Sequence, residues 1–277
     1  MGREGHIRPC SVCGTFYPAD PVELRRVVES MLADADGPRN NAAHPVGVIV
    51  PHAGYAYSGP TAACAYAWLA GRNFETVVIV SPSHQEYFRG VSVFPGEAYE
   101  TPLGKVPIHG SLRDALMEDG SLVQCSVAGH GKEHAIEVQL PFLQVVLGEF
   151  SMIPLVMGDQ NRETCFSLGK LLASTIAGRE VLLVASTDLS HYHEAEEAEV
   201  LDTRGRQRIE AMDAELLMQD LDAGRTEACG GGPTVAVMAA LSSLGVPSMQ
   251  IVHHCNSGDV TGERRVVVGY CSAVAWR

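Results

Sequence analysis

The stretch that decides the fold is Val46–Gly59, which reads VGVIVPHAGYAYSG. Val46–Val50 is a short apolar run bounded by a turn signal, which is typical of a strand buried on both faces. Pro51 has no N–H to donate to a sheet, so the strand ends there, and the next side chain is the imidazole of His52. In an open parallel sheet, ligands bind beyond the carboxyl ends of the strands. The stretch therefore predicts a buried strand that delivers His52 to a binding site.

Two further buried strands end in histidines. Thr76–Ser83 (TVVIVSPS) precedes His84, and Val181–Leu189 (VLLVASTDL) precedes His191 and His193. A single histidine is more often a packed or surface residue than a ligand. Three strands that each deliver an imidazole to the same sheet edge favour a shared site.

The other segments alternate helices with strands. Helices are predicted over Pro21–Ala33, from Pro60 to Leu69, and over Ser111–Met117, Arg162–Ile176, Glu194–Leu221 and Pro233–Leu241. Further strands are predicted over Gly90–Phe94, Phe150–Gly158 and Arg264–Trp276, with a turn-rich hairpin or lid at Glu97–Gly104. With 277 residues, 46% of them hydrophobic, and no linker or repeat, the chain is expected to form one α/β domain over residues 1–277. Its sheet should be predominantly parallel and flanked by helices.

Composition narrows the partners and the compartment. The 20 basic and 33 acidic residues give a formal net charge of −13, and no Lys/Arg cluster exceeds two adjacent residues. Nucleic-acid binding needs a concentrated basic face, so no such partner is expected. The apolar runs are too short for a membrane span, and residues 1–14 lack the apolar core of a signal peptide. We therefore expect a cytoplasmic protein with no membrane partner.

In that compartment the cysteines are expected to be reduced, and most should be small buried hydrophobic residues. They are Cys10, Cys13, Cys64, Cys125, Cys165, Cys229, Cys255 and Cys271. Cys10 and Cys13 have the CxxC spacing of redox and zinc motifs. No second CxxC accompanies them and no thioredoxin-like strand precedes them, which favours a structural interpretation.

Cys229 stands before a glycine-rich helix start, GGGP. The glycines allow close backbone approach, and no Lys–Ser/Thr pair follows to make a phosphate-binding loop. Positive potential at a helix start favours a thiolate, the form that binds metal or attacks a substrate. A buried packing role is the alternative, and the sequence leaves both open.

Gly129–Leu147, GHGKEHAIEVQLPFLQVVL, contains a helix with one apolar face. Glu133, His134 and Glu137 fall in its first turn or just before it. The two carboxylates either complement the positive helix end or belong to the site. Both interpretations stay open at this point.

Two imidazoles and one anionic ligand describe an open metal site. His52, His84 and Cys229 are the candidate ligands, and a thiolate shifts the preference toward copper, zinc or ferrous iron. Asp188 and His191 would then orient a ligand or handle protons. The same residues allow another chemistry, in which Cys229 is a nucleophile, His191 its base and Asp188 the orienting group.

Five motifs, taken in order, resemble the Memo family: PHAGYAYSG, SPSH at 81–84, EHAIEVQLPFL, STDLSH and the Cys229–Gly loop. The resemblance runs from TFYPADP to the final GYCSAVAW. It implies a single α/β domain similar to the LigB-type extradiol dioxygenases and a metal pocket at His52, His84 and Cys229. Pocket positions with catalytic roles would be His191, Asp188 and His134. Extradiol dioxygenases have a Glu as third ligand where this chain has Cys229, and this departure argues against ring cleavage.

The resemblance leaves three functions open. The first is a metalloprotein with Fe(II) or Cu, or else Zn, that performs redox or oxygenase-type chemistry on a small substrate. The second is an extradiol ring-cleaving dioxygenase with Fe(II). The third is a non-catalytic module that recognises a peptide or a system partner in the same pocket. Microbial family members occur with AMMECR-type and radical-SAM proteins, which are the implied partners, and human relatives are associated with signalling by binding.

Overall fold

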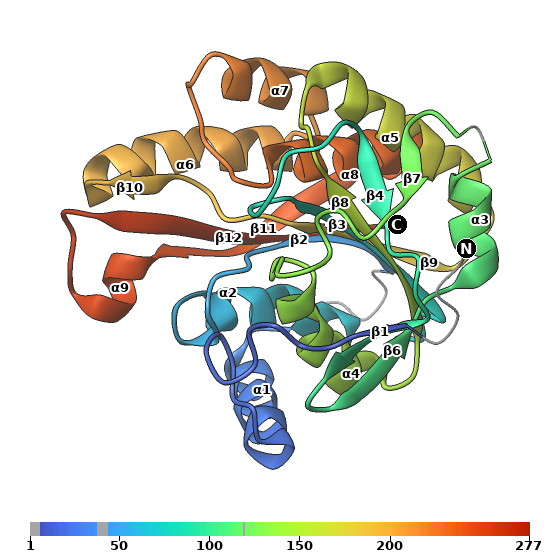
Figure 1. Ribbon diagram of the computed structural model, residues 1–277. Coiled ribbons are helices and arrows are strands. Elements are labelled where there is room, and N and C mark those ends of the chain that lie inside the picture. Colours follow the sequence, from blue (N-terminus) through green and yellow to red (C-terminus); the bar gives the residue numbers. More distant parts are fainter. Residues whose placement is uncertain (1–5, 38–43, 119) are drawn as a thin grey trace.

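The computed structural model describes residues 6–37, 44–118 and 120–277 (Figure 1). Its helices are α1 (Pro21–Asp34), α2 (Tyr55–Tyr66), α3 (Gly110–Leu116), α4 (Leu140–Leu147), α5 (Arg162–Ile176), α6 (Ala195–Glu210), α7 (Ala214–Asp222), α8 (Gly231–Ser243) and α9 (Ser257–Thr261), with 3-10 turns η1 (Ala67–Leu69) and η2 (Glu137–Gln139). Its strands are β1 (Ile7–Arg8), β2 (Pro45–Val50), β3 (Thr76–Pro82), β4 (Val91–Val93), β5 (Ala98–Thr101), β6 (Gly104–Pro107), β7 (Val123–Cys125), β8 (Ser151–Met157), β9 (Val181–Ser186), β10 (His191–His193), β11 (Ser248–Asn256) and β12 (Val267–Trp276).

The large sheet lies between two helical layers. Its strand order is β10-β12-β2-β9-β3-β8-β4-β7. Strands β10 and β2 pair with different parts of β12, and β11 also pairs with β12. Figure 1 shows α5, α6, α7 and α8 on one face and α1, α2 and α4 on the other. A small second sheet, β1-β5-β6, includes the β5–β6 hairpin that was one of the two predicted forms of Glu97–Gly104.

The centre of the large sheet is parallel. Strands β2, β9, β3 and β8 pair in parallel, so their carboxyl ends share one edge. Antiparallel pairs flank this centre, β12 with β2 and β4 with β8. The predicted α/β class is confirmed. The sheet is mixed because β12 and β4 run antiparallel to the central strands that they flank.

Continuous apolar runs form the central strands because each strand has a helical layer on both faces. In β2, Ile49 packs into the core below α5 and α8, whereas Val48 and Val50 pack into the core with α1, α2 and α4. All three side chains are fully buried. Full burial of such a residue stabilises the fold by about 1.5–3 kcal/mol. A polar substitution in β2 should therefore destabilise the fold, which would test the assignment of this segment as a buried strand.

Two predicted helices differ from the structure. Helix α2 begins at Tyr55, so Pro60 lies inside it rather than at its start. Tyr55 anchors this early start, because its buried ring packs in the core and its phenol donates to the Val138 carbonyl at 2.6 Å. The long helix predicted over Glu194–Leu221 breaks into α6 and α7 at Met212, whose φ of 52° is left-handed.

Strands β7, β10 and β11 had no counterpart in the sequence analysis. They are short or partly exposed flanking strands, so they lack the apolar runs that identify β2, β3 and β9. None of the helices in the described ranges combines the length and the apolar character needed to cross a bilayer.

The expected reduction of all cysteines is wrong for one pair. Cys10 and Cys13 form a disulfide, whereas the other six cysteines, all within the described ranges, are free. The spacing places the two Cα atoms 5.9 Å apart, which is within the usual reach of a disulfide. Cys64 and Cys271 are buried, as predicted.

Stability should depend on pH through His130. Its ring accepts from the Tyr99 hydroxyl at Nδ1, donates to Ser92 at Nε2, and is 1% exposed. Burial, with the nearby charge of Arg8, lowers the pKa of His130 to about 3. Below pH 6.5 the unfolded chain binds a proton that the folded chain excludes, so stability falls as the pH falls from 6.5 toward 3.

We expect His130→Gln to make this loss shallower by about 1.4 kcal/mol per pH unit. Urea unfolding of both proteins at pH 7, 6, 5 and 4 provides the measurement. Parallel pH profiles for the two proteins would contradict the assignment.

Candidate metal centre

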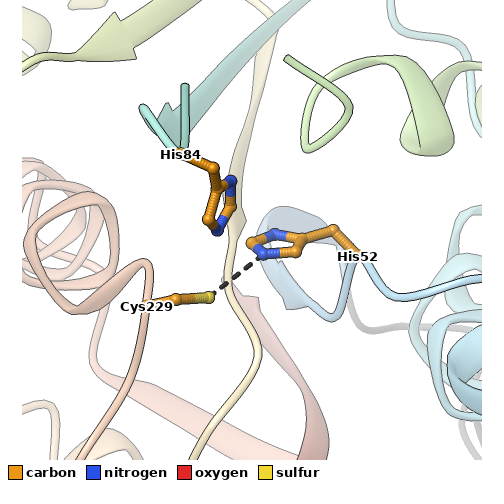
Figure 2. Close-up of side chains that lie close together, drawn as sticks. All are labelled: His52, His84 and Cys229. Atoms are coloured by element: carbon orange, nitrogen blue, oxygen red, sulfur yellow. Dashed lines mark hydrogen bonds between the residues drawn. The ribbon is translucent and has the colours of Figure 1, made fainter. Parts of the chain in front are cut away.

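Three side chains from separate elements meet at the carboxyl edge of the sheet. His52 follows β2, His84 follows β3, and Cys229 precedes α8. Figure 2 shows the three side chains pointing toward one another. Their candidate ligand atoms, one from each residue, lie within 4.8 Å of one another. The sequence prediction that these residues come together is therefore realised in the geometry.

The orientation of His52 is set by Ser186. The Ser186 hydroxyl donates to the Ala135 carbonyl at 2.7 Å, so its oxygen must accept from His52 Nδ1–H at 2.9 Å. His52 Nε2 is then left with a lone pair, and it faces Cys229 Sγ at 3.1 Å. Burial, followed by the neighbouring imidazoles, holds the pKa of His52 well below its ordinary value. His52 is thus a neutral ring that presents Nε2 toward the centre.

His84 is oriented by Glu133. Its backbone N–H donates to Glu133 Oε2 at 2.6 Å and its Nδ1–H to Oε1 at 2.9 Å, which leaves Nε2 free. Although burial opposes protonation, the hydrogen bond and charge of Glu133 raise the pKa of His84 above its ordinary value. Burial likewise opposes ionisation of Glu133, but its bonds to His84 and to the Ala135 N–H lower the pKa of this carboxyl. Glu133 therefore orients the candidate ligand His84, and it also accepts the His134 and Ala135 N–H groups.

The surroundings of Cys229 favour the thiol over the thiolate. Burial, with the charge of Asp188, raises the pKa of the Cys229 thiol far above its ordinary value. The N–H groups of Asp188, 3.3 Å from Sγ, and of Gly230 lower the pKa of the thiol, but burial outweighs them. Other N–H groups of the helix start are engaged elsewhere: Gly230 donates to Thr187 Oγ1 at 3.0 Å and Gly232 to Gln160 Oε1 at 2.7 Å. A bound cation would reverse this preference, since metals deprotonate coordinating thiols.

The predicted close approach of the glycine-rich turn is present. A side chain at Gly230 would collide with the Ser186 carbonyl oxygen and with Thr187. The turn that carries Cys229 therefore packs directly on the end of β9, where Ser186 orients His52.

Asp188, His191 and His134 adjoin the three ligands. Asp188 is 5% exposed and accepts the His52 N–H at 2.7 Å, and burial raises its pKa to about 7. His191 donates from Nδ1 to the Leu189 carbonyl at 2.8 Å. The His134 ring stacks on His84 with centroids 4.8 Å apart. His84, Glu133 and His134 form a second close group of metal-ligating type.

One expectation about this edge is wrong, and one alternative left open by the sequence lacks its hydrogen bonds. His193 does not join the centre, because it pairs with Glu197 and Glu227. The nucleophile arrangement of Cys229, His191 and Asp188 is not assembled either. Cys229 contacts His52, and Asp188 accepts from the His52 backbone, so neither orients His191.

A cavity of about 470 Å³ opens beside Cys229 and His191. Met218 and Leu221 contribute apolar surface, and Asp222 and Glu227 contribute carboxylates. Its described lining contains no Lys or Arg. The candidate centre therefore faces a space of small-molecule size with an acidic side.

Glu137 has a structural role. It is fully buried and accepts from Arg8, from the Ser11 and Val12 N–H groups, from the Ser11 hydroxyl, and from the Tyr17 hydroxyl. Arg8 lies 2.7 Å away, and although burial opposes ionisation, the Arg8 charge helps to lower the pKa of Glu137. This carboxylate anchors the N-terminal segment and does not face the candidate ligands.

Sequence reasoning missed the residues that orient the histidines. Gln139 is 1% exposed and donates to Pro51 O at 2.9 Å and to Ser186 Oγ at 3.0 Å. Tyr66 in turn donates to Gln139 Oε1 at 2.9 Å. The available signal was a single polar residue within an apolar element, Ser186 in VLLVAS and Gln139 in VQLPFL. Such residues must find buried partners.

The fold and the site together define an α/β protein with an open group of two histidines and one cysteine at a sheet edge. The model of the family described as Memo-like protein matches residues 8–274. A MEMO1 family protein of Methanothermobacter thermautotrophicus is 38% identical over 272 residues, covering 95% of this chain and 98% of that protein. Another, from Thermotoga neapolitana, is 37% identical over 281 residues, covering 97% and 99%. The chain therefore belongs to the Memo family.

A solved structure of an uncharacterized protein from Escherichia coli K12 has a similar fold. Its TM-score is 0.54 at 17% identity, covering 83% of this chain and 100% of that one. At this identity the similarity concerns the fold alone.

Ser186→Ala should weaken metal binding about 10- to 100-fold, the usual cost of removing a residue that orients a ligand. Without the hydroxyl, His52 Nδ1–H loses its acceptor and the ring is free to change tautomer. Chelator competition gives the affinity, and the nitrogen chemical shifts of His52 report the tautomer. Ser272→Ala is the matched control, because that buried hydroxyl has no partner among the described residues. Equal affinities for both variants would contradict this role.

Proposed function

We propose that this protein is a metalloprotein in which His52, His84 and Cys229 hold a redox-active metal, Fe(II) or Cu, for oxidation–reduction or oxygenase-type chemistry on a small substrate. The observation that carries the proposal is the convergence of three candidate ligand atoms within 4.8 Å. Two of these atoms belong to histidine rings whose orientation is fixed by hydrogen bonds from Nδ1 to Ser186 and Glu133.

The donor set fits such a metal. Ser186 and Glu133 each accept from an Nδ1–H, so both rings offer Nε2 to the centre. Cys229 adds a soft donor that becomes anionic on binding. Imidazole and thiolate suit copper, iron and zinc, whereas magnesium and calcium prefer oxygen ligands. A metal bound here would supply Lewis acidity or electron transfer to a substrate at its open position.

The chain's own residues can move protons beside that position. Burial raises the pKa of Asp188 to about 7, which is close to the range where a group gives and takes protons efficiently. His191 has its Nδ1–H engaged with Leu189, so Nε2 is its available acceptor. His134, which stacks on His84, is a third proton-handling candidate.

The cavity supports a neutral or positively charged small substrate. Asp222 and Glu227 line it, and the described lining contains no cationic residue to pair with an organic anion. An amine-bearing molecule could place its charge near these carboxylates while another group reaches Cys229 and His191. Cytoplasmic residence remains a prediction from the sequence, and partnership with AMMECR-type and radical-SAM proteins remains a prediction from the family resemblance.

Two alternatives remain distinguishable by experiment. Ring cleavage by bound Fe(II) would yield a ring-opened product from a catechol, despite Cys229 in place of a Glu. A binding module would take up a peptide or partner in the same pocket, with an affinity unchanged by Cys229→Ala. The buried, fully oriented His52 favours a metal function over a vestigial pocket.

The test is the metal content of anaerobically purified protein, measured by elemental mass spectrometry beside the His52→Ala/His84→Ala variant. We expect close to one Fe or Cu per chain in the wild type and a loss of at least about 100-fold in affinity in the double variant. Oxygen uptake with catechols and amines then tests turnover. Zinc at full occupancy would redirect the search to hydrolysis, and a wild type that takes up neither Fe(II) nor Cu(I) would overturn the proposal.

A further inference from the structure

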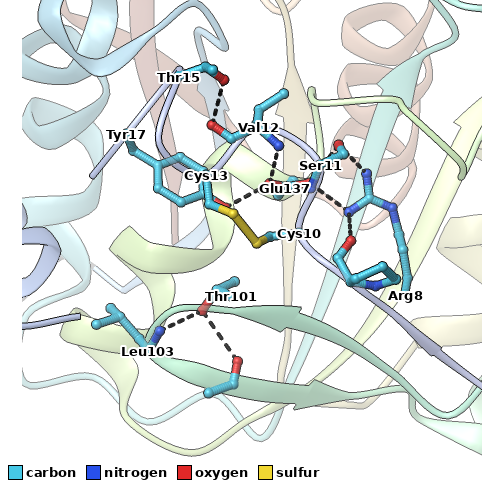
Figure 3. The surroundings of a disulfide bond; sticks show 12 residues. Arg8, Cys10, Ser11, Val12, Cys13, Thr15, Tyr17, Thr101, Leu103 and Glu137 are labelled. Atoms are coloured by element: carbon cyan, nitrogen blue, oxygen red, sulfur yellow. Dashed lines mark hydrogen bonds and ion pairs between the residues drawn. A yellow bond between two sulfur atoms is a disulfide. The ribbon is translucent and has the colours of Figure 1, made fainter. Parts of the chain in front are cut away.

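The Cys10–Cys13 disulfide closes a turn whose backbone serves the buried carboxylate of Glu137. Between the two cysteines, the Ser11 N–H donates to Glu137 Oε2 at 2.8 Å and the Val12 N–H to Oε1 at 3.0 Å. Two consecutive amides thus reach both oxygens of one carboxylate. Figure 3 shows the disulfide beside this pair of bonds. The covalent ring holds the turn in the conformation that directs both N–H groups inward.

The turn belongs to a strap, residues 8–17, that lies against the elements of the metal centre. The Phe16 carbonyl accepts the Tyr55 N–H at 2.8 Å, which ties the strap to the first residue of α2, three positions after His52. The Phe16 ring packs on His134 with centroids 4.8 Å apart. Glu137 itself begins η2, three residues after His134. The strap therefore contacts two residues near the centre, Tyr55 and His134, and is anchored by Glu137.

The disulfide is accessible to exchange. Cys10 and Cys13 are partly exposed and Ser11 is exposed, so a reductant can reach the bond from solvent. The other six cysteines of the chain are free. A disulfide in a reducing compartment is usually transient and catalytic or redox-sensing.

We propose that Cys10 and Cys13 form a reversible redox site: as a disulfide the pair orders the strap against the metal centre, and as a dithiol it releases the strap. In the reducing step a dithiol reductant gives two electrons and two protons. The S–S bond breaks, two cysteine thiols form, and the reductant leaves as its own disulfide. The part of the inference that concerns metal affinity rests on the proposed function.

The test begins with metal-free wild-type protein, oxidised with glutathione disulfide or reduced with a dithiol. Hydrogen exchange is followed in peptides that cover residues 8–17 and Tyr55. On reduction we expect exchange in both segments to become about 10-fold faster or more, as local opening becomes easier. Alkylation and mass spectrometry across a series of glutathione ratios should show the pair converting reversibly in a two-electron step. Fe(II) affinity, measured in the same two states, should fall about 5-fold or more on reduction.

Cys10→Ala/Cys13→Ala should reproduce the reduced exchange pattern and lose its response to reductant, while Cys125→Ser, which removes an exposed free thiol, should respond as wild type does. Equal exchange in the oxidised and reduced wild type would overturn the proposal, as would a pair that never oxidises at any glutathione ratio. If neither state binds Fe(II) or Cu(I), the proposed function fails, whereas the exchange data still decide the redox site.

Discussion

Cys229→Ser is expected to lower the affinity for Fe(II) or Cu(I) at least about 100-fold, more than the loss of any residue that only orients a ligand. Cys229 Sγ lies 3.1 Å from His52 Nε2, so it belongs to the ligand group itself. Serine keeps the size but replaces a soft donor with a hydroxyl, which these metals bind poorly. Competition with a chromophoric chelator under anaerobic conditions gives the ratio of affinities.

Two variants serve as controls for this measurement. His191→Ala removes an imidazole that lines the same cavity but bonds to the Leu189 carbonyl, so its effect should stay below about 10-fold. Cys125→Ser removes a thiol that is exposed and free, and it should have no effect. Equal losses for Cys229→Ser and His191→Ala would show that His191 is itself a ligand.

Glu137→Gln is expected to lower the free energy of unfolding by about 3–5 kcal/mol, the usual cost of removing one partner from a buried ion pair. Arg8 is 3% exposed and Glu137 is fully buried, so the substitution leaves the guanidinium without its counter-charge. The amide also cannot accept at both oxygen positions from the Ser11 and Val12 N–H groups. Urea unfolding of the metal-free protein provides the measurement.

The matched control is Glu29→Gln in the exposed Arg25–Glu29 pair, where both side chains are at least half exposed. Its cost should be below about 1 kcal/mol, because solvent screens the interaction. A double variant, Arg8→Met/Glu137→Met, should recover part of the loss, since no charge is then left buried alone. A change as small in Glu137→Gln as in Glu29→Gln would refute the anchoring role.

Several features of the site could be predicted from the sequence. The strands that precede His52 and His84 are apolar runs that end at or near a proline. The apolar run follows from burial on both faces of the sheet, and the strand end follows from the missing N–H of proline. Their convergence at one edge follows from parallel pairing, because parallel strands share the direction of their carboxyl ends. The glycines after Cys229 likewise predicted a close backbone approach, which Gly230 makes to Ser186 and Thr187.

Other features depended on partners distant in the chain. The prediction of a Cys229 thiolate considered only the helix start, whereas the structure occupies that start with Gln160 and Thr187 and buries the sulfur. The sequence left Cys229 open as a metal ligand with His52 or as a nucleophile with His191, and the structure places its sulfur 3.1 Å from His52 Nε2. Glu133 and Glu137 looked alike in sequence, yet one orients a histidine and the other anchors the strap.

The sequence by itself determined the α/β class, the strands that carry the histidines and the identity of the candidate ligands, because these depend on local hydrophobic pattern and on donor chemistry. Only the tertiary structure decided which nitrogen each ring presents, which of Glu133 and Glu137 orients a histidine, and that Cys10 and Cys13 form a disulfide. The physical reason is that hydrogen-bond direction and burial are properties of side chains brought together from distant elements, and no local pattern of residues encodes them.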